Sequence, residues 1–417
     1  MGKQLVLSNP FPPGTKIIYP YKMAGLPAEQ QSRGVYAKQA RLETPFDKFC
    51  TFSDKKAFCT LYKHMLSNRN LALLSDKITY CDPNAEDGKL FSKASCHASP
   101  VLQELYAFES IFNDGVKMLN DITNKDSYIP EDEHTRTLLL PLLAFLFDEE
   151  SHRCLRSLSV GVKNETQLMV TLGMHFFSKL AVAKEFTMDK CAAKKDYLCI
   201  CGNCEKKEIL SRFDDTSVGH GKVWHGNVDI MLESCDIGVH CSPTEETSTG
   251  ERTTVEVKFC DLNSFIVRDH MLAQTITFSF LQQQRHPAFK HSLIPSILAS
   301  NKSVQFFFYD SKNDILLESA EFDFFDYDGS THILNYQAVI ATWFVVNYRY
   351  LSSGPTESIL NAPKADFPKF AGDALDIYKS ELKYRRVSET VEEKELPSRV
   401  RWKISRGFYY ELPLKME

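Results

Sequence analysis

The sequence predicts an α/β protein of the α+β type, with a mixed central sheet, a helical elaboration before it and further helices after it. Three observations predict this class. Apolar residues recur with helical spacing between residues 100 and 186. Over residues 197–259 the spacing of the apolar residues changes from about 3.6 residues, as in a helix, to about 2 residues, as in a strand. Helical patterns return after residue 266. The length of 417 residues and the hydrophobic content of 43% fit a globular protein with one elaborated domain or with two or three domains.

Residues 1–95 predict an irregular, basic N-terminal arm or subdomain. Prolines interrupt this segment, and its one convincing helical pattern covers residues 54–67. Residues 1–80 hold 12 Lys and Arg against 5 Asp and Glu, interleaved with Tyr and Phe. Such a mixture can contact phosphates and stack on bases, although solvated lysines on a loop that wraps the core are the alternative.

Residues 96–160 predict a helical region. Ser99 and Pro100 are typical of a helix start, and apolar residues with helical spacing continue to Ile122. A second helix is predicted over residues 133–147 and would be kinked or divided at Pro141. Asn164 can cap a third helix, which would run from residue 165 to about residue 186.

Residues 161–325 are expected to contain the sheet. Strand patterns cover residues 197–200, 208–213, 223–232, 253–259, 303–309 and 314–318, with a helical pattern at 266–284. Residues 326–382 predict helices at 332–350 and 370–382 that pack on this core, and residues 383–417 predict a charged C-terminal extension. Neither a signal-peptide pattern nor an apolar stretch long enough to cross a bilayer is seen. We therefore expect an intracellular protein of the nucleus or cytoplasm, without a membrane partner.

Charged residues interrupt two of the apolar strand patterns. Asp229 lies in the pattern at 223–232, and Glu256 and Lys258 share one face of the pattern at 253–259. Burying such charges costs several kcal/mol unless a cation or a partner compensates them. A divalent metal ion would compensate them. Taken alone, Glu256 and Lys258 also fit an exposed ion pair that contributes roughly 0 to 1 kcal/mol.

The order of a helix, strands with an Asp, a strand with Glu-x-Lys, a helix and a strand resembles the PD-(D/E)XK nuclease superfamily, in its RecB-like and phage-exonuclease-like branch. The resemblance covers residues 165–318 and implies a restriction-endonuclease-like αβββαβ core. It implies that Asp229, Glu256 and the carbonyl of Val257 bind one or two Mg²⁺ or Mn²⁺ ions. It also implies that Lys258 orients the attacking water or stabilises developing negative charge. Val228 stands where the family usually has a proline.

Two further residues follow from this resemblance. Gln274 is similar to the Gln of the family's Q-x-x-x-Y element in the helix after the Lys, with Phe278 in place of the Tyr. The family also places a Glu on the first core helix as a ligand of the metal or the water, and Glu165 is the candidate here, with Glu185 as the alternative.

His225 precedes Asp229 by four residues on the same expected strand face. This spacing makes it a candidate contact for the scissile phosphate or the metal. A histidine at a strand edge that hydrogen-bonds to the backbone is the alternative interpretation.

A cluster of cysteines precedes the expected nuclease strands. Cys201 and Cys204 fit one half of a structural zinc site, and the other half would come from Cys191, Cys199 or a distant His. His175 lies on the apolar side of the third expected helix, and we interpret it as a packed core residue.

Together these patterns predict a metal-dependent nuclease, in which a magnesium-activated water hydrolyses phosphodiester bonds, in DNA rather than RNA. The alternative is a catalytically inactive protein that binds nucleic acid or another protein on a nuclease-like scaffold, for example one derived from a mobile element. The formal net charge of −5 gives no overall nucleic-acid signature.

Overall fold

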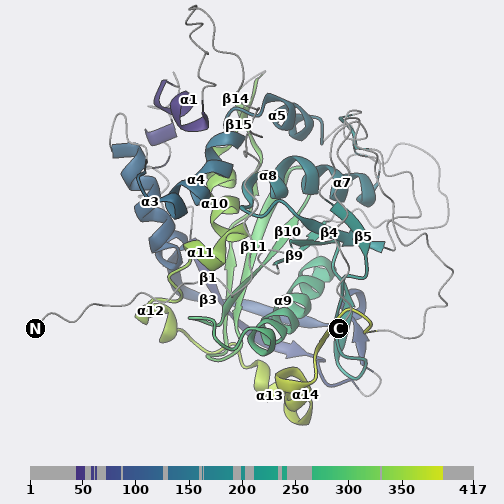
Figure 1. The fold of residues 1–417 in the computed structure, drawn as a ribbon. Helices are drawn as coiled ribbons and strands as arrows, with labels where there is room; N and C mark the ends of the chain where they lie inside the picture. The colour runs from purple at the N-terminus through teal and green to yellow at the C-terminus, as the bar shows by residue number, and fades with distance from the viewer. Residues whose placement is uncertain are drawn as a thin grey trace, which may run out of the picture. The chain divides into compact units, whose positions relative to one another are not determined.

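A large mixed sheet organises the part of the chain that the computed structural model describes, and helices surround it (Figure 1). Its main strand order is β3-β1-β12-β11-β10-β9-β8-β4-β5, and β13 pairs with β11. The described residues are 44–51, 58–60, 62, 72–85, 88–124, 130–158, 162, 164–190, 199–201, 211–232, 237–241, 265–328 and 331–387. The strands of this sheet are β1 (Ala72–Cys81), β3 (Cys96–Ala107), β4 (Phe186–Asp189), β5 (Ser211–Asp214), β8 (Ile230–Leu232), β9 (Ile237–Cys241), β10 (Leu293–Ala299), β11 (Ser303–Asp310), β12 (Ile315–Ser319) and β13 (Phe322–Asp323).

The sheet combines antiparallel and parallel pairs. Strands β4, β8 and β9 are antiparallel neighbours, whereas β9 and β10 are parallel. Because parallel neighbours need a crossover between them, a helix is expected there, and α9 (Phe265–Arg285) fills this place. The remaining strands, from β10 through β11, β12 and β1 to β3, are antiparallel.

Helices cover both faces of the centre of the sheet. Every residue of β10 and β11 is buried, as expected for strands that are covered on two sides. Phe308 of β11 contacts Phe112, which stacks on Phe344 of α10 with 5.2 Å between the ring centroids. Its neighbour Tyr309 contacts Phe280 of α9 instead. Since successive side chains of a strand point to opposite faces, α9 and α10 lie on opposite faces of β11.

The other helices are short. Several begin at a side-chain cap, including α4 at Asp132, α5 at Asp148 and α7 at Asn164. Their bounds are α1 (Pro45–Thr51), α3 (Asn113–Asn124), α4 (Glu133–Phe145), α5 (Glu149–Arg156), α7 (Glu165–Leu172), a π-helical turn (Gly173–Phe177), α8 (Ser178–Leu180), α10 (Tyr336–Val346), α11 (Tyr348–Leu351), α12 (Glu357–Leu360), α13 (Phe367–Ala371) and α14 (Leu375–Ser380). Short 3₁₀ turns cover Phe91–Lys93, Phe108–Ile111 and Gly372–Ala374.

Two small sheets complete the described structure. One has the order β16-β6-β7-β2, and the other is the hairpin of β14 and β15. Gly219 in β6 has a φ of +115°, and a Cβ there would lie 2.3 Å from the carbonyl oxygen of Trp224, so only glycine allows this close pairing with β7. The strands are β2 (Lys89–Leu90), β6 (Ser217–Gly219), β7 (Trp224–Asn227), β16 (Lys383–Tyr384), β14 (Phe325–Asp328) and β15 (Thr331–Leu334).

Several expectations from the sequence are confirmed. The helices expected at 133–147 and 266–284 are α4 and α9, and Pro141 lies inside α4. The strands expected at 303–309 and 314–318 are β11 and β12. The class expected from the sequence, a mixed α/β protein with a large mixed sheet, is also observed. Residues 43–417 form one compact unit.

The helix expected over residues 100–122 is wrong in its first half. Ser99 and Pro100 belong to β3 and pair with Lys77 and Asp76 of β1, and the helix α3 begins only at Asn113. Because β3 is an edge strand, it tolerates a proline that cannot donate a hydrogen bond. β1 itself lies within the segment 1–95 that was expected to be irregular.

Other boundaries also differ from expectation. The helix expected over 165–186 ends at Leu180, and β4 begins at Phe186. The first residues of the helix expected over 332–350 form β15 instead. The single strand expected over 223–232 is two strands, β7 and β8, separated by Val228 and Asp229. The strand pattern at 253–259 and the extension after residue 387 lie outside the described residues.

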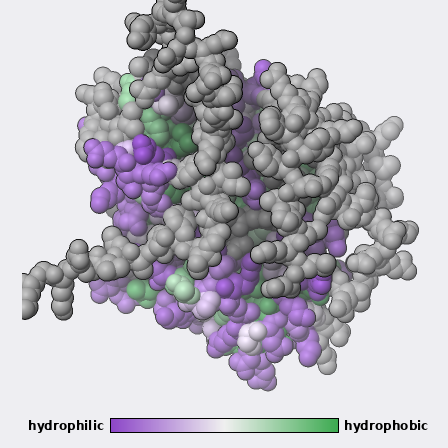
Figure 2. Space-filling view, in the orientation of Figure 1, coloured by the Kyte–Doolittle hydropathy of each residue, from purple (hydrophilic) through white to green (hydrophobic). Residues whose placement is uncertain are grey.

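The described surface in Figure 2 is mainly hydrophilic, with small hydrophobic areas between the polar ones. Among the described residues, no helix combines the length and the apolar character that a membrane span requires.

Candidate active site

Asp229 lies at the break between β7 and β8, where the chain leaves one sheet and enters the other. The antiparallel register pairs Ile230 with Val239, so Asp229 lies beside the end of β9. Its carboxylate accepts a hydrogen bond of 2.7 Å from the backbone N–H of Cys241 and lies 2.8 Å from Nδ1 of His240. The Asp229 side chain is 15% exposed, so this ion pair is largely shielded from water.

His240 is the centre of this site. Burial opposes protonation of its imidazole, but the Asp229 carboxylate and the charge of Glu165 outweigh burial and raise the pKa of His240. Burial and the same two carboxylates raise the pKa of the neighbouring Cys241 thiol well above its usual range. The site therefore favours a protonated histidine beside a neutral thiol.

Glu165 reaches the site from a different element. It is the first residue of α7, whose N-terminus is capped by Asn164 through a 2.9 Å hydrogen bond from the N–H of Gln167. Helix α7 contacts β9, and the charge of Glu165 acts on both His240 and Cys241. Two carboxylates that are far apart in the sequence, Glu165 and Asp229, therefore share one electrostatic environment.

Helix α9 contributes His270, which faces His240. The two imidazole rings stack with 4.3 Å between their centroids and 29° between their planes. Burial and the neighbouring charge of His240 lower the pKa of His270 well below its usual range. Within the described residues, the buried Nε2 atom of His270 has no hydrogen-bond partner. Two stacked histidines whose pKa values are shifted in opposite directions thus lie side by side.

Gln274 follows His270 by one helical turn and is fully buried. A Cβ placed on Gly238 of β9 would lie 3.1 Å from Gln274 Nε2, so the amide lies directly over this strand. The amide has a polar contact with the imidazole of His270 that raises the pKa of this histidine against the effect of burial, but neither amide atom forms a hydrogen bond of regular geometry with the described residues. A buried amide without such partners is costly, because the loss of its hydration is not compensated.

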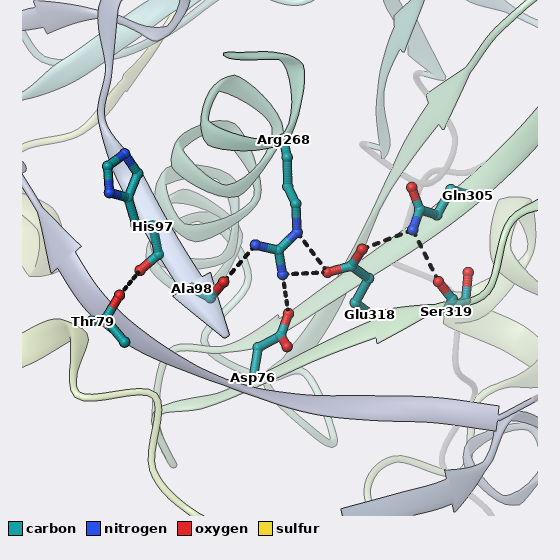
Figure 3. A network of polar contacts seen from close by, with 8 residues as sticks. All are labelled: Asp76, Thr79, His97, Ala98, Arg268, Gln305, Glu318 and Ser319. Atoms are coloured by element: carbon teal, nitrogen blue, oxygen red, sulfur yellow. Dashed lines mark hydrogen bonds and ion pairs between the residues drawn. The ribbon is translucent and has the colours of Figure 1, made fainter. Parts of the chain in front are cut away.

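A polar network around Arg268 anchors helix α9 nearly two turns before Gln274 (Figure 3). Nη2 of Arg268 lies 2.7 Å from the carboxylates of both Asp76 and Glu318, and its Nη1 donates to the carbonyl oxygen of Ala98 at 2.7 Å. Gln305 in turn donates to Glu318 at 2.8 Å. These contacts join α9 to β1, β3, β11 and β12, and they fix the position of the helix that carries His270.

In the Arg268 network, one guanidinium group faces the carboxyl groups of both Asp76 and Glu318. Burial and the neighbouring Glu318 carboxyl raise the pKa of Asp76 to about 8, against the opposing effect of Arg268. Asp76 is completely buried, and its Oδ1 atom has no hydrogen-bond partner within the described residues. Asp76 therefore titrates in a pH range where an ordinary aspartate is fully ionised.

The other residues expected at the metal site lie elsewhere or outside the described part. His225 is in β7, where its Nδ1 donates to the carbonyl oxygen of Val223 at 2.8 Å, and β7 belongs to a different sheet from β8. Glu185 is exposed between α8 and β4. Glu256, Val257 and Lys258 lie outside the described residues, in the connection between β9 and α9.

The cysteine cluster also differs from the expected set. Cys191 and Cys204 lie outside the described residues. Cys201 lies beside Cys154 and His175, and one potential ligand atom from each of the three lies within 4.8 Å of the other two. Burial, followed by the neighbouring Cys201 and Cys199, raises the pKa of the Cys154 thiol to about 12. His175 is buried as expected, but it faces sulfur ligands rather than apolar side chains alone.

Sequence reasoning missed His240, His270 and Cys154. The alternation of Ile237, Val239 and Cys241 is the sequence signal for the short strand that carries His240. Comparisons of the chain with protein-family models, with curated proteins and with solved structures returned no match.

Proposed function

We propose that this protein is a metal-dependent nuclease that hydrolyses phosphodiester bonds in DNA. One observation carries the proposal. Glu165, Asp229 and Gln274, which the PD-(D/E)XK resemblance selects from three separate segments, lie around the same short strand, β9. Residues chosen without knowledge of the fold would rarely converge in this way.

The order of the elements also supports the proposal. Helix α7, strands β4, β8 and β9, helix α9 and strand β10 follow one another as αβββαβ, with β5, β6 and β7 inserted after β4. The four strands are adjacent in the sheet, in the order β4-β8-β9-β10. In this arrangement β9 (Ile237–Cys241) is the third core strand. The resemblance had assigned that strand to residues 253–259 instead. We propose that Glu256 and Lys258, which lie between β9 and α9 in the sequence and outside the described residues, supply the second acid and the lysine of this site.

The donor set fits a hard divalent cation. Magnesium prefers oxygen ligands, and the carboxylates of Asp229 and Glu165 together with the buried Oε1 of Gln274 are of this kind. When bound, a magnesium ion activates a water molecule and offsets charge on the phosphorus. Lys258 would stabilise the negative charge that develops on the phosphate.

His240 has a defined part in this mechanism. In the absence of a bound metal ion, the imidazolium of His240 offsets the negative charge of the Asp229 carboxylate. With Asp229 serving as a metal ligand, His240 would lose the carboxylate contact that favours its imidazolium and would hold its proton less tightly. Metal binding should therefore release protons at a pH below the pKa of His240.

A second function, nucleic-acid or protein binding without catalysis, is favoured by one observation. The Asp229 carboxylate is already satisfied by His240 and by the N–H of Cys241, so the pair is stable without a cation. Such a self-sufficient pair would suit a nuclease-like scaffold that has lost its activity.

Cleavage of DNA by the purified full chain separates the two functions. We expect magnesium or manganese to support degradation of DNA, and a chelator to abolish it. Lys258→Ala and Asp229→Asn should remove cleavage while their thermal unfolding remains cooperative. Lys117→Ala, on the exposed side of α3, is the matched control and should cleave normally.

Each result decides between the proposals. Full activity of Lys258→Ala would overturn the assigned mechanism. Salt-sensitive DNA binding without any cleavage by the wild-type protein would support the non-catalytic scaffold. Parallel assays on linear and covalently closed circular DNA distinguish exonuclease from endonuclease action, since an exonuclease requires a free end.

A further inference from the structure

Three segments bring sulfur and nitrogen ligands together on the side of α7 and α8. Cys154 comes from α5, His175 from the π-helical turn Gly173–Phe177, and Cys201 from the described residues 199–201. One potential ligand atom from each lies within 4.8 Å of the others. Cys154 and His175 are both buried, with 3% and 5% of their surfaces exposed. Tetrahedral zinc with Zn–S distances of about 2.3 Å places its ligand atoms about 3.8 Å apart, so small side-chain movements would bring these three atoms to a zinc ion.

The hydrogen bonds around His175 select the form of the imidazole that can bind a metal. The hydroxyl of Ser151 has one proton, which it donates to the carboxylate of Asp148 at 2.9 Å. The same hydroxyl oxygen lies 3.3 Å from Nδ1 of His175 and can therefore only accept a hydrogen bond from it. In the neutral imidazole, this arrangement places the proton on Nδ1 and leaves the lone pair of Nε2 for a ligand, as in metal-binding histidines.

The hydrogen-bonded chain continues to a charged residue. Nζ of Lys179 donates to the Asp148 carboxylate at 2.9 Å, so the order is Lys179, Asp148, Ser151 and His175. Outer contacts of this kind orient a metal-binding imidazole and define its tautomer. A π-helical turn is rare and is often found at functional sites, and here it carries the histidine.

Cys199 is the candidate for a fourth ligand, and its Sγ would have to move toward the three atoms that already lie within 4.8 Å of one another. Cys199 is buried two residues before Cys201, and its charge acts on Cys154. Its Sγ atom lies 3.7 Å from the hydroxyl of Thr171 in α7. Three cysteines and one histidine are a common ligand set for structural zinc, because thiolates favour zinc over magnesium or calcium.

We propose that Cys154, His175, Cys199 and Cys201 bind a structural zinc ion. Four protein ligands close the coordination shell, so the ion joins α5, the π-helical turn and residues 199–201 and takes no part in catalysis. This site is independent of the proposed nuclease centre. It differs from the set expected from the sequence because Cys154 and His175 replace Cys191 and Cys204.

Metal analysis of the full-length protein tests the proposal. Protein purified without a polyhistidine tag should contain about one zinc ion per chain after dialysis against a weak chelator. Cys154→Ser and Cys201→Ser should lose nearly all of it. Cys59→Ser, whose thiol lies 3.8 Å from the carbonyl oxygen of Thr123 on α3, is the matched control and should retain it. Wild-type protein with no zinc after expression in zinc-supplemented medium would overturn the site.

Cobalt substitution tests the same site where the cysteine variants fail to fold. Wild-type protein loaded with Co²⁺ should show the thiolate-to-cobalt charge-transfer and visible bands of a tetrahedral Cys₃His centre. Absence of these bands would overturn the proposal. Cys204→Ser should keep its zinc, and loss of zinc from this variant with retention in Cys199→Ser would overturn the assignment of Cys199.

Discussion

Replacement of Gln274 by methionine should stabilise the fold and remove activity at the same time. Methionine has a similar length and no polar group that needs a partner. Both amide atoms of Gln274 are buried without a regular hydrogen bond among the described residues, and burial of such a group costs roughly 1 to 3 kcal/mol. We expect the free energy of unfolding to rise by about 1 to 3 kcal/mol, which for a unit of this size raises the Tm by roughly 1 to 4 °C.

Urea and thermal unfolding measure the stability of the Gln274→Met variant, and cleavage of DNA with magnesium measures its activity. Activity should fall by about tenfold or more, because a buried polar group next to the reacting centre is lost. Thr342→Val is the matched control. Its hydroxyl is also buried without a hydrogen-bond partner among the described residues, but it lies in α10, on the opposite side of β11 from α9. The control should be stabilised and should cleave DNA normally.

A clear result would refute this reasoning. If Gln274→Met lowers the free energy of unfolding by more than about 1 kcal/mol, the amide makes a structural hydrogen bond. Gln274 would then be a core residue of α9, and its proximity to His270 would carry no information about a ligand.

Three further predictions concern titrating groups and close packing. Asp229→Asn should lower the pKa of His240, because the carboxylate that raises it is removed; an unchanged histidine titration by NMR would contradict the ion pair. The folded-state pKa of Asp76, about 8, lies above that of an unfolded aspartate, so its contribution to stability is complete below about pH 4 and is lost as the pH rises through 8. Asp76→Asn should therefore flatten the decline of Tm between pH 5 and 8, and an identical slope in both proteins would refute the shift. Gly238→Ala should destabilise the protein by about 1 to 3 kcal/mol in urea unfolding. The new Cβ would lie 3.0 Å from Val228 Cγ1 and 3.1 Å from Gln274 Nε2. Unchanged stability would show that the site is not tightly packed.

Local patterns predicted the long elements of the fold well. The helices α4 and α9 have strong periodicity over more than ten residues, and β11 is a long apolar run. Errors arose where pairing with a distant strand decided the outcome. Ser99 and Pro100 form a good local helix start, but their partners Lys77 and Asp76 hold them in β3. Strand β8, with three residues, is too short for its period to be recognised.

The residues of the candidate site also divide into those that local sequence patterns reveal and those that depend on distant parts of the chain. Asp229 was found from the sequence because a charge in an apolar strand is visible locally. The role of His240 depends on the register of β8 against β9 and on a helix that begins 24 residues after Cys241 in the chain, at Phe265. Cys154 could not be joined to Cys201 by any spacing rule, since two helices, a π-helical turn and a strand separate them.

The pairing of β1 with β12 has a consequence for how this chain is made. Asp76 in β1 pairs with Leu316 in β12, which is synthesised 240 residues later. One edge of β1 therefore stays unpaired until the ribosome has made β12. At about 5 to 20 residues per second, the ribosome needs roughly 10 to 50 seconds to supply it. During this interval the hairpin of β1 and β3 presents an open edge that other chains can pair with. Nascent chains that stop before Ile315 should therefore depend on chaperones, whereas release of the full chain closes the sheet and ends that dependence.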